Sequence, residues 1–470
     1  MAENIYLSQL IKVRGRFHRS VQIKSDWAEK KSLNEYILTP TAQNLAIQIS
    51  EGAISSQGPK AWSIIGPYGT GKSAFSLFLV DLFCTETPLH PEGKILRERI
   101  LENHKPFIPI LISGHRTKLN KELLKGLADG LSLIDSNISN KAALLSDQNI
   151  ISDRDIIDLF GVANNVAKTA DFGGLLIIID EFGKFLEFAA QNPEEEDVFT
   201  LQHLAELAER SNPPIVLVTV LHTAFSEYLH SLDRSQQLEW QKVQGRFTNS
   251  PFLEPHEQLI QLVGTAIDSN FSAEVQGENQ RRINHVLSDA SLSETKKRLH
   301  LEGLLSRCVP LDPITTLVLP SLFRSKLTQN ERSLFAFLTS REPFGFQDFL
   351  ARSEIIGSFV PFYRLDSLYD YVINSLGSSV FIGDRSHRWA GIESALQRIP
   401  TDWPPLTISI VKAIGLIGLY GPQIGLSPST STLYLIFHNV EAVDEALLYL
   451  IKASIVIFRK HENAYGLWEG

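Results

Sequence analysis

The sequence predicts an α/β fold, with a parallel, doubly wound sheet at its centre and a mainly helical part after about residue 255. Two observations lead to this prediction. Apolar runs typical of strands buried on both faces alternate with segments of helical periodicity, which is the order that crossover helices between parallel strands require. In addition, a glycine-rich turn joins the first apolar run to the first helical segment.

The elements of the expected sheet and its covering helices alternate along the first half of the chain. We expect its strands at residues 61–65, 108–112, 175–179 and 215–220. We expect its main helices at residues 73–83, 123–134 and 198–210. The polar stretch 135–155 is expected to form an inserted loop or a weak helix.

Composition excludes several classes of protein. The chain has 470 residues, 43% hydrophobic and 21% charged, which excludes disordered, collagen-like and coiled-coil chains. A net charge of −9 excludes a basic coat for nucleic acid and leaves only local patches. With two cysteines and no long apolar run, we expect a cytoplasmic protein without disulfides or a membrane span. The histidines lack zinc-ligand spacing, so no zinc site is expected.

Residues 66–73 match the phosphate-binding pattern G-x-x-x-x-G-K-[ST] between an expected strand and an expected helix. Glycines let the backbone amides approach phosphate oxygens, and the helix N-terminus favours the same anions. In such a loop Lys72 reaches the β- and γ-phosphates of ATP, and the Ser73 hydroxyl binds Mg²⁺. We therefore expect these residues to bind ATP: Gly66, Pro67, Tyr68, Gly69, Thr70, Gly71, Lys72, Ser73 and Ala74.

A second motif follows the apolar run 175–179, where the chain continues with Asp180 and Glu181. An Asp at the carboxyl end of a parallel strand lies beside the phosphate loop and can hold Mg²⁺ together with Ser73. Glu181 is then placed to activate the attacking water. Because the run 108–112 comes between the two motifs, we expect an extra strand to separate their strands. This arrangement is typical of hydrolytic P-loop ATPases of the additional-strand class.

Three further polar groups are candidates for the reaction itself. Either Thr219, in the last strand, or His222, just past its end, is expected to contact the phosphates and the catalytic water. Arg246 follows an expected helix and a glycine break. In an assembly such an arginine can enter a neighbour's ATP site and neutralise charge in the transition state, although an ordinary surface arginine fits the same pattern.

These residues resemble AAA+ ATPases, through GPYGTGKS, LLIIIDE, the polar strand end and Arg246. The wider pattern is similar to large ATPases of bacterial defence islands, such as the ATPase of the BREX phage-exclusion system. The segments that carry this similarity are RSVQIKSDW (19–27), AWSIIGPYGTGKSAFSLFL (61–79), EWQKVQGRF (239–247) and QNERSLFAFL (329–338).

The resemblance implies a homo-oligomer that hydrolyses ATP, with an arginine supplied in trans and a partner defence protein or effector. Ser73 and Asp180 are farther apart in sequence than in a minimal AAA+ core, so residues near 115–170 are expected to be an insertion. Similar proteins continue beyond a strand like the last one here, so we expect a further effector or partner-binding region.

We expect four parts: residues 1–55, an ATPase core at 56–265, a helical lid at 266–400 and a winged-helix domain at 401–470. In the lid, Arg332 either reaches the γ-phosphate of its own subunit or forms a structural salt bridge. The third helix of the winged-helix domain begins with acidic residues. These would repel DNA phosphates, so we favour a protein-docking or lid role there, while DNA contact elsewhere stays possible.

The N-terminal part contains a basic stretch. Residues 12–24 hold five basic residues and no acidic one, which predicts a strand with one cationic face. That face is expected to touch nucleic acid, line the nucleotide site or simply meet solvent.

Three functions remain open on the sequence alone. The first is an oligomeric ATPase that remodels DNA or partner proteins in antiviral defence. The second is a slow, nucleotide-gated switch or scaffold that licenses a separate effector such as a nuclease. The third is a DNA remodeller that resembles initiators or clamp loaders.

Overall fold

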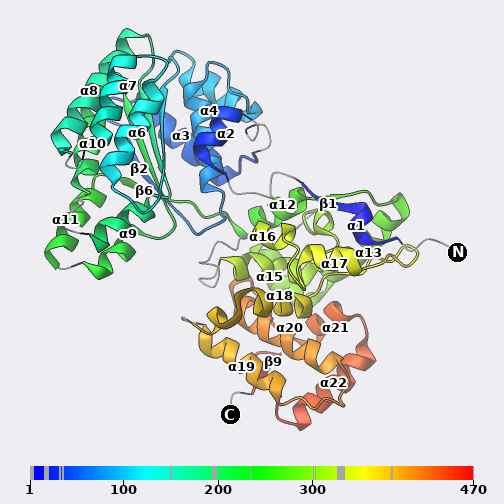
Figure 1. Ribbon diagram of the computed structural model, residues 1–470. Coiled ribbons are helices and arrows are strands. Elements are labelled where there is room, and N and C mark those ends of the chain that lie inside the picture. The colour runs from blue at the N-terminus through cyan, green and yellow to red at the C-terminus, as the bar shows by residue number, and fades with distance from the viewer. Residues whose placement is uncertain are drawn as a thin grey trace. The chain divides into compact units, whose positions relative to one another are not determined.

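The chain forms two compact units, Ser20–Glu254 and Met1–Arg19 together with Pro255–Gly470 (Figure 1). The structure is a computed structural model. It describes residues 5–14, 21–30, 33, 36–148, 151–192, 198–232, 234–299, 301, 303–324, 334–382 and 385–468. The division into four parts expected from the sequence stays a prediction.

A five-stranded parallel sheet, in the order β3–β4–β5–β2–β6, is the centre of the first unit. Its strands are β2 (Ala61–Ile65), β3 (Ile108–Ser113), β4 (Leu175–Asp180), β5 (Ile215–Leu221) and β6 (Thr248–Pro251). This confirms the α/β core and its parallel sheet. An extra strand does separate β2 from β4, but it is β5. The run between the two motifs in sequence, β3, lies at the edge of the sheet.

The central strand β4 shows why the sheet is covered on both faces. All six of its residues are buried. Leu176 and Ile178 pack with Phe75 in the apolar core on one face, and Ile177 and Ile179 belong to the core on the other. A strand with apolar side chains on both faces is stable only between two layers of helices. Figure 1 shows these two layers on either side of the sheet.

Helices from consecutive parts of the unit form the two layers. One layer contains α2 (Ile23–Glu29), α3 (Pro40–Ile54), α4 (Lys72–Cys84) and α5 (Pro91–Leu96). The other contains α6 (Leu119–Leu131), α7 (Ser136–Ser146), α8 (Asp153–Thr169), α9 (Gly183–Gln191), α10 (Phe199–Arg210) and α11 (Arg234–Gln244). The stretch expected as a loop or weak helix therefore contains α7. Its first turn is capped by the Asp135 carboxylate, which accepts hydrogen bonds from the backbone amides of Asn137 and Ile138.

The second unit is mainly helical. Its elements before the C-terminal module are α1 (Leu7–Leu10), β1 (Ile11–Val13), α12 (His256–Ala266), β7 (Ile267–Ser269), α13 (Ala273–Ser288), α14 (Ser293–Arg298), α15 (Pro313–Phe323), α16 (Leu334–Thr339), α17 (Phe346–Arg352), α18 (Leu365–Leu376) and α19 (Ser386–Gln397). Among the described residues of both units, no helix combines the length and the apolar character needed to cross a membrane.

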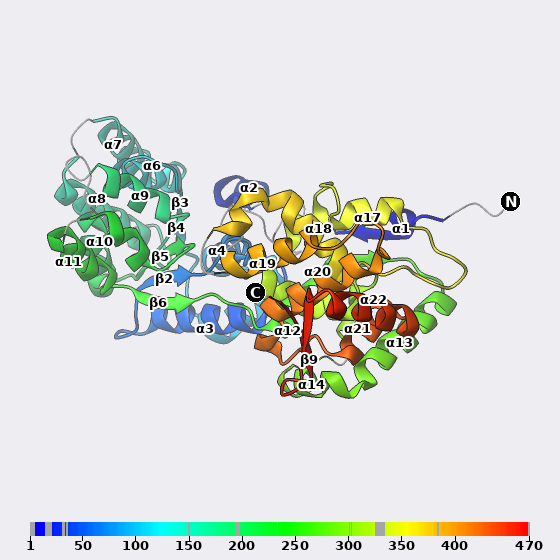
Figure 2. The same ribbon diagram turned by 90° about the horizontal axis from the view of Figure 1, so that it is seen from below.

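The C-terminal module consists of three helices followed by a two-stranded hairpin, the order of elements expected from the sequence. Its elements are α20 (Leu406–Tyr420), α21 (Thr430–Phe437), α22 (Val440–Lys452), β8 (Val456–Arg459) and β9 (Ala464–Leu467). The two strands pair antiparallel, with Val456 opposite Leu467. In Figure 2, β9 lies beside this group of helices. Leu433 and Leu450 are buried in the core that α20, α21 and α22 share.

The N-terminal basic stretch is not one continuous strand, so that expectation is wrong. Among the described residues of this stretch, only Ile11–Val13 forms a strand, which pairs antiparallel with β7. Residues 23–29 are helical because α2 buries Ile23 and Asp26 against its own unit. Lys24 on this helix pairs with Asp129 of α6, with 3.0 Å between Nζ and Oδ2. Residues 15–20 lie outside the described part of the chain.

Candidate functional site

The glycine-rich loop links the end of β2 to the start of α4, at the carboxyl edge of the sheet. Gly69 and Gly71 have φ angles of 72° and 86°, which favour glycine. A Cβ on Gly66 would come within 2.4 Å of the Phe252 carbonyl oxygen. The loop therefore needs glycine for two different reasons, backbone conformation and close approach. Thr70 steadies the turn by donating from its hydroxyl to the Pro67 carbonyl at 2.9 Å.

Lys72 starts α4 and points back into the loop. Its side chain is 4% exposed, and its ammonium donates to the carbonyl oxygens of Gly66 and Pro67. Burial lowers the pKa of Lys72 to about 8, against the opposing effect of the Asp180 and Glu181 carboxylates. The ammonium therefore lies in the loop, within electrostatic range of Asp180 at the end of β4 and of Glu181, which follows it.

Ser73 and Asp180 are brought together from opposite motifs. Burial raises the pKa of Asp180, and a hydrogen bond from the Ser73 hydroxyl to its carboxylate opposes this shift. Asp180 is 5% exposed and also accepts a hydrogen bond from the Glu181 amide at 3.0 Å. A hydroxyl and a carboxylate are hard oxygen ligands, and Mg²⁺ is commonly held by few protein ligands together with substrate phosphates. These two residues fit the expected Mg²⁺ site.

Glu181 occupies a tight turn that the sequence did not indicate. Its φ angle is 51°, in the left-handed region. The backbone directly after β3 lies against this turn, because the Gly114 amide donates to the Asp180 carbonyl at 2.8 Å. A Cβ on Gly114 would lie 2.1 Å from the Glu181 carbonyl oxygen. Gly114 is thus a residue that the site needs and that only the pairing of β3 with β4 reveals.

The Glu181 carboxylate is paired with Lys184, in the first turn of α9. Their Nζ and Oε2 atoms are 2.5 Å apart, and both side chains are partly exposed. Lys184 belongs to neither sequence motif and was not expected at the site. The signal available for it was its spacing, since a residue three positions after Glu181 faces the same side once the chain turns into a helix.

Thr219 lies inside the sheet, two positions before β5 ends. It stands opposite Ser63 of β2 in the register, and its hydroxyl donates to the Trp62 carbonyl at 3.3 Å. The side chain is buried. The hydroxyl is therefore already satisfied by the main chain of the neighbouring strand.

His222, the alternative to Thr219, directly follows β5 and stacks on Tyr68 of the phosphate loop. Both ring nitrogens are buried without a hydrogen-bond partner among the described residues. Burial, followed by the charges of Lys72 and Lys184, lowers the pKa of His222 to about 3. The ring is therefore neutral near pH 7. Its two unsatisfied nitrogens beside the loop are polar groups that a phosphate oxygen or a water would satisfy.

The two arginines proposed from the sequence are not among the described residues that contact Lys72, Asp180 or Glu181. Arg246 follows α11 and pairs with Glu206 of α10 in the same chain, with 2.9 Å between Nη2 and Oε1. Its side chain is 43% exposed. Arg332 lies outside the described residues.

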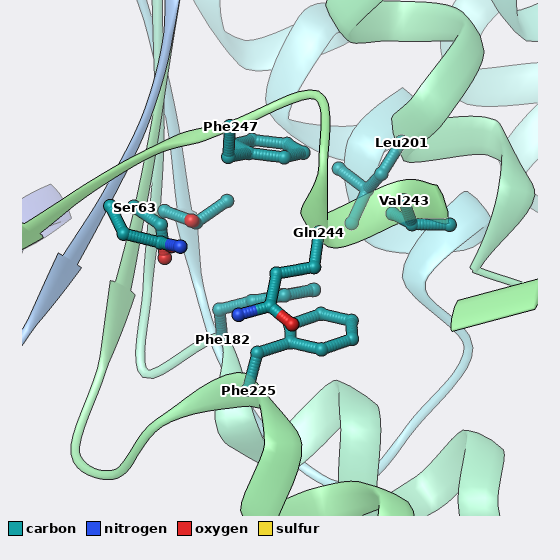
Figure 3. A pocket seen from close by; sticks show the side chains of 9 residues that line it. Ser63, Phe182, Leu201, Phe225, Val243, Gln244 and Phe247 are labelled. Carbon is teal, nitrogen blue, oxygen red and sulfur yellow. The ribbon is translucent and has the colours of Figure 1, made fainter. Parts of the chain in front are cut away.

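A small cavity lies between the sheet and the helices α10 and α11, and Thr219 is one of its lining residues. Figure 3 shows this cavity. Gln244, at the end of α11, extends toward Phe182 and Phe225. The residues that line the cavity are Ser63, Phe182, Leu201, Thr219, Phe225, Val243, Gln244, Phe247 and Asn249. None of these is a cation, so the chemistry of the cavity does not suit a phosphate. The cluster at the strand ends, with Lys72, is the better candidate for a phosphate site.

No protein-family model matches the chain, and no curated protein matches it significantly. One similar solved structure is that of the ORC2 protein of Aeropyrum pernix, determined as ADPNP and ADP complexes. It is 12% identical, with a TM-score of 0.39, and the match covers 98% of this chain and 94% of that one.

Proposed function

We propose that this protein binds ATP with Mg²⁺ and hydrolyses it to ADP and phosphate. The observation that carries the proposal is the meeting of two motifs at one edge of the sheet. Lys72 and Ser73 begin α4, whereas Asp180 ends β4 and Glu181 follows it. Ser73 nevertheless hydrogen-bonds Asp180, and both carboxylates oppose the lowering of the Lys72 pKa by burial. A structural turn would not need a buried ammonium, a buried carboxylate and a glycine cradle together.

Each residue has a distinct part in the proposed reaction. The loop amides and Lys72 bind the β- and γ-phosphates, and Ser73 with Asp180 holds Mg²⁺, which supplies charge neutralisation at the phosphates. Glu181 orients and activates the water. In this proposal His222 contacts the γ-phosphate or that water through a ring nitrogen, and the buried nitrogens without a described hydrogen-bond partner support this role. The Thr219 hydroxyl is bonded within the sheet, so we favour His222 over Thr219 for this contact.

The proposed activity is that of an AAA+-like ATPase that works as a homo-oligomer on a partner protein. The exposed side of α22 favours a protein over DNA as the partner, because Glu441, Asp444 and Glu445 lie beside the exposed apolar side chains of Leu448 and Ile451. The role in antiviral defence and the contribution of Arg246 in trans remain parts of this proposal. They rest on the resemblance of the sequence.

The second candidate function, a slow nucleotide-gated scaffold, is favoured by the pairing of Glu181 with Lys184. A carboxylate engaged by a cation is less available to activate water. The two candidates differ in turnover. We would measure phosphate release over a range of protein concentrations, alone and with single- or double-stranded DNA. Steady multiple turnover supports the ATPase, whereas tight ATP binding with less than one turnover in the assay supports the scaffold.

A further inference from the structure

Lys184 is a cation of the site that neither sequence motif includes. Its Nζ atom lies 2.5 Å from the Glu181 carboxylate. After burial, the charges of Lys72 and Lys184 both lower the pKa of His222. The Glu181 carboxylate in turn opposes the lowering of the Lys72 pKa by burial. Lys184 therefore belongs to the same electrostatic cluster as the ammonium that marks the phosphate position.

Helix stability does not explain why a lysine occupies this position. Lys184 is in the first turn of α9, where the helix dipole disfavours a positive charge. Glu187 is available three residues further along the same helix, yet it pairs with Arg116, with 3.1 Å between the charged atoms. The Lys184 side chain thus pairs with Glu181 directly after β4 and not with Glu187 on its own helix.

Lys184 also contrasts with the arginine expected to act on the phosphates. The Arg246 guanidinium pairs with Glu206 on α10. By contrast, the only described partner of the Lys184 ammonium is Glu181, a residue of the site itself. Lys184 side-chain exposure is 37%, so it is accessible to a bound ligand and still partly shielded from water.

We propose that Lys184 exchanges its ion pair with Glu181 for an ionic contact with the terminal phosphate of ATP. This inference rests on the proposed function of the site. The exchange has two consequences. The chain supplies a second cation to the γ-phosphate of its own ATP, and the Glu181 carboxylate becomes free to orient the water only when a γ-phosphate is present. ADP lacks that phosphate and leaves the pair intact.

The test compares binding of the non-hydrolysable analogue AMP-PNP with binding of ADP, both with Mg²⁺, by calorimetry. Lys184→Gln should weaken AMP-PNP binding by roughly tenfold, the range of one charged hydrogen bond, and leave ADP binding within about twofold. Lys184→Arg should restore most of the difference. Arg116→Gln is the matched control, because it removes a similar ion pair from α9, and it should change neither affinity.

The exchange also predicts the effect of substituting Glu181, the residue that pairs with Lys184. Glu181→Gln releases Lys184, so AMP-PNP should bind more tightly than to the wild type while ADP does not. This gain should vanish in the double variant Glu181→Gln with Lys184→Gln, which makes the two residues non-additive. If Lys184→Gln weakens both nucleotides equally or neither, the proposed contact is wrong. If the wild type itself binds neither nucleotide, the proposed function has failed as well.

Discussion

The ring of His222 stacks on the ring of Tyr68, with 3.4 Å between centroids and 16° between planes. The contact joins the phosphate loop to the end of β5, which lies next to β2 in the sheet. It also fixes the orientation of an imidazole whose two nitrogens have no hydrogen-bond partner among the described residues. A change in loop position on nucleotide binding would therefore be transmitted directly to His222.

We expect His222→Ala to lower ATP turnover by about a hundredfold, the cost of one lost polar contact to developing charge, with ATP affinity kept within a few-fold. Thr219→Val is the matched control, since it removes a hydroxyl of the same strand that already bonds Trp62. It should turn over ATP at close to the wild-type rate. Steady-state phosphate release checks both. A larger loss in Thr219→Val would assign the contact to Thr219 instead.

Asp180→Asn should uncouple nucleotide binding from Mg²⁺. The substitution keeps the shape of the side chain but removes the charge that, with Ser73, suits a hard cation. In the wild type, Mg²⁺ should strengthen ATP binding by roughly tenfold or more. In the variant, ATP affinity should be the same with Mg²⁺ as with a chelator. A full Mg²⁺ effect in Asp180→Asn would place the cation elsewhere.

Gly114→Ala should destabilise the turn that carries Glu181. The added methyl would meet the Glu181 carbonyl oxygen at 2.1 Å, a contact that only a backbone shift relieves. We expect a loss of about 1–3 kcal/mol in the free energy of unfolding in urea, together with reduced turnover. The control is Gly161→Ala in α8, where no atom lies within 4 Å of the added carbon. That change should be neutral or stabilising by up to about 1 kcal/mol. Equal effects of the two substitutions would contradict the argument.

The sequence predicted the sheet well because its strands carry a strong local signal. The run Leu175–Ile179 is apolar at every position, which is typical of a strand covered on both faces. The order of the strands has no such local signal. Which strand lies between β2 and β4 depends on how the chain crosses over, so the position of β3 at the edge was not predicted.

The N-terminal stretch shows a different limit. Its alternating basic and apolar residues predicted a strand up to Lys24, yet Ile23–Glu29 forms a helix. Periodicity over so few residues does not distinguish the two structures when burial of Ile23 and Asp26 decides.

The candidate site was predicted to the extent that it depends on motifs. Lys72, Ser73, Asp180 and Glu181 belong to patterns in which spacing and chemistry are inseparable, and the structure brings them together. Lys184 belongs to no such pattern. Its pairing with Glu181 depends on the turn at the end of β4 and on where α9 begins.

Arg246 is proposed to act on the ATP site of a neighbouring subunit, and a mixing experiment tests this role. We expect turnover to rise with protein concentration and to fall roughly a thousandfold in Arg246→Ala with ATP affinity kept. Mixing Arg246→Ala with Lys72→Ala should restore part of the activity, because an empty subunit supplies its arginine to a neighbour. Glu206→Gln, which breaks the ion pair but keeps the arginine, should stay active. No recovery in mixtures that assemble together would leave Arg246 a structural residue.

The central claim is that the phosphate loop and the acidic end of β4 form one ATP site. The most direct measurement is ATP binding and phosphate release by the wild type, Lys72→Ala and Glu181→Gln under the same conditions. We predict that Lys72→Ala binds no detectable ATP, because it lacks the main side-chain charge on the phosphates. Glu181→Gln should bind and retain ATP without releasing phosphate. Unchanged ATP affinity in Lys72→Ala, or wild-type turnover in Glu181→Gln, would contradict the claim.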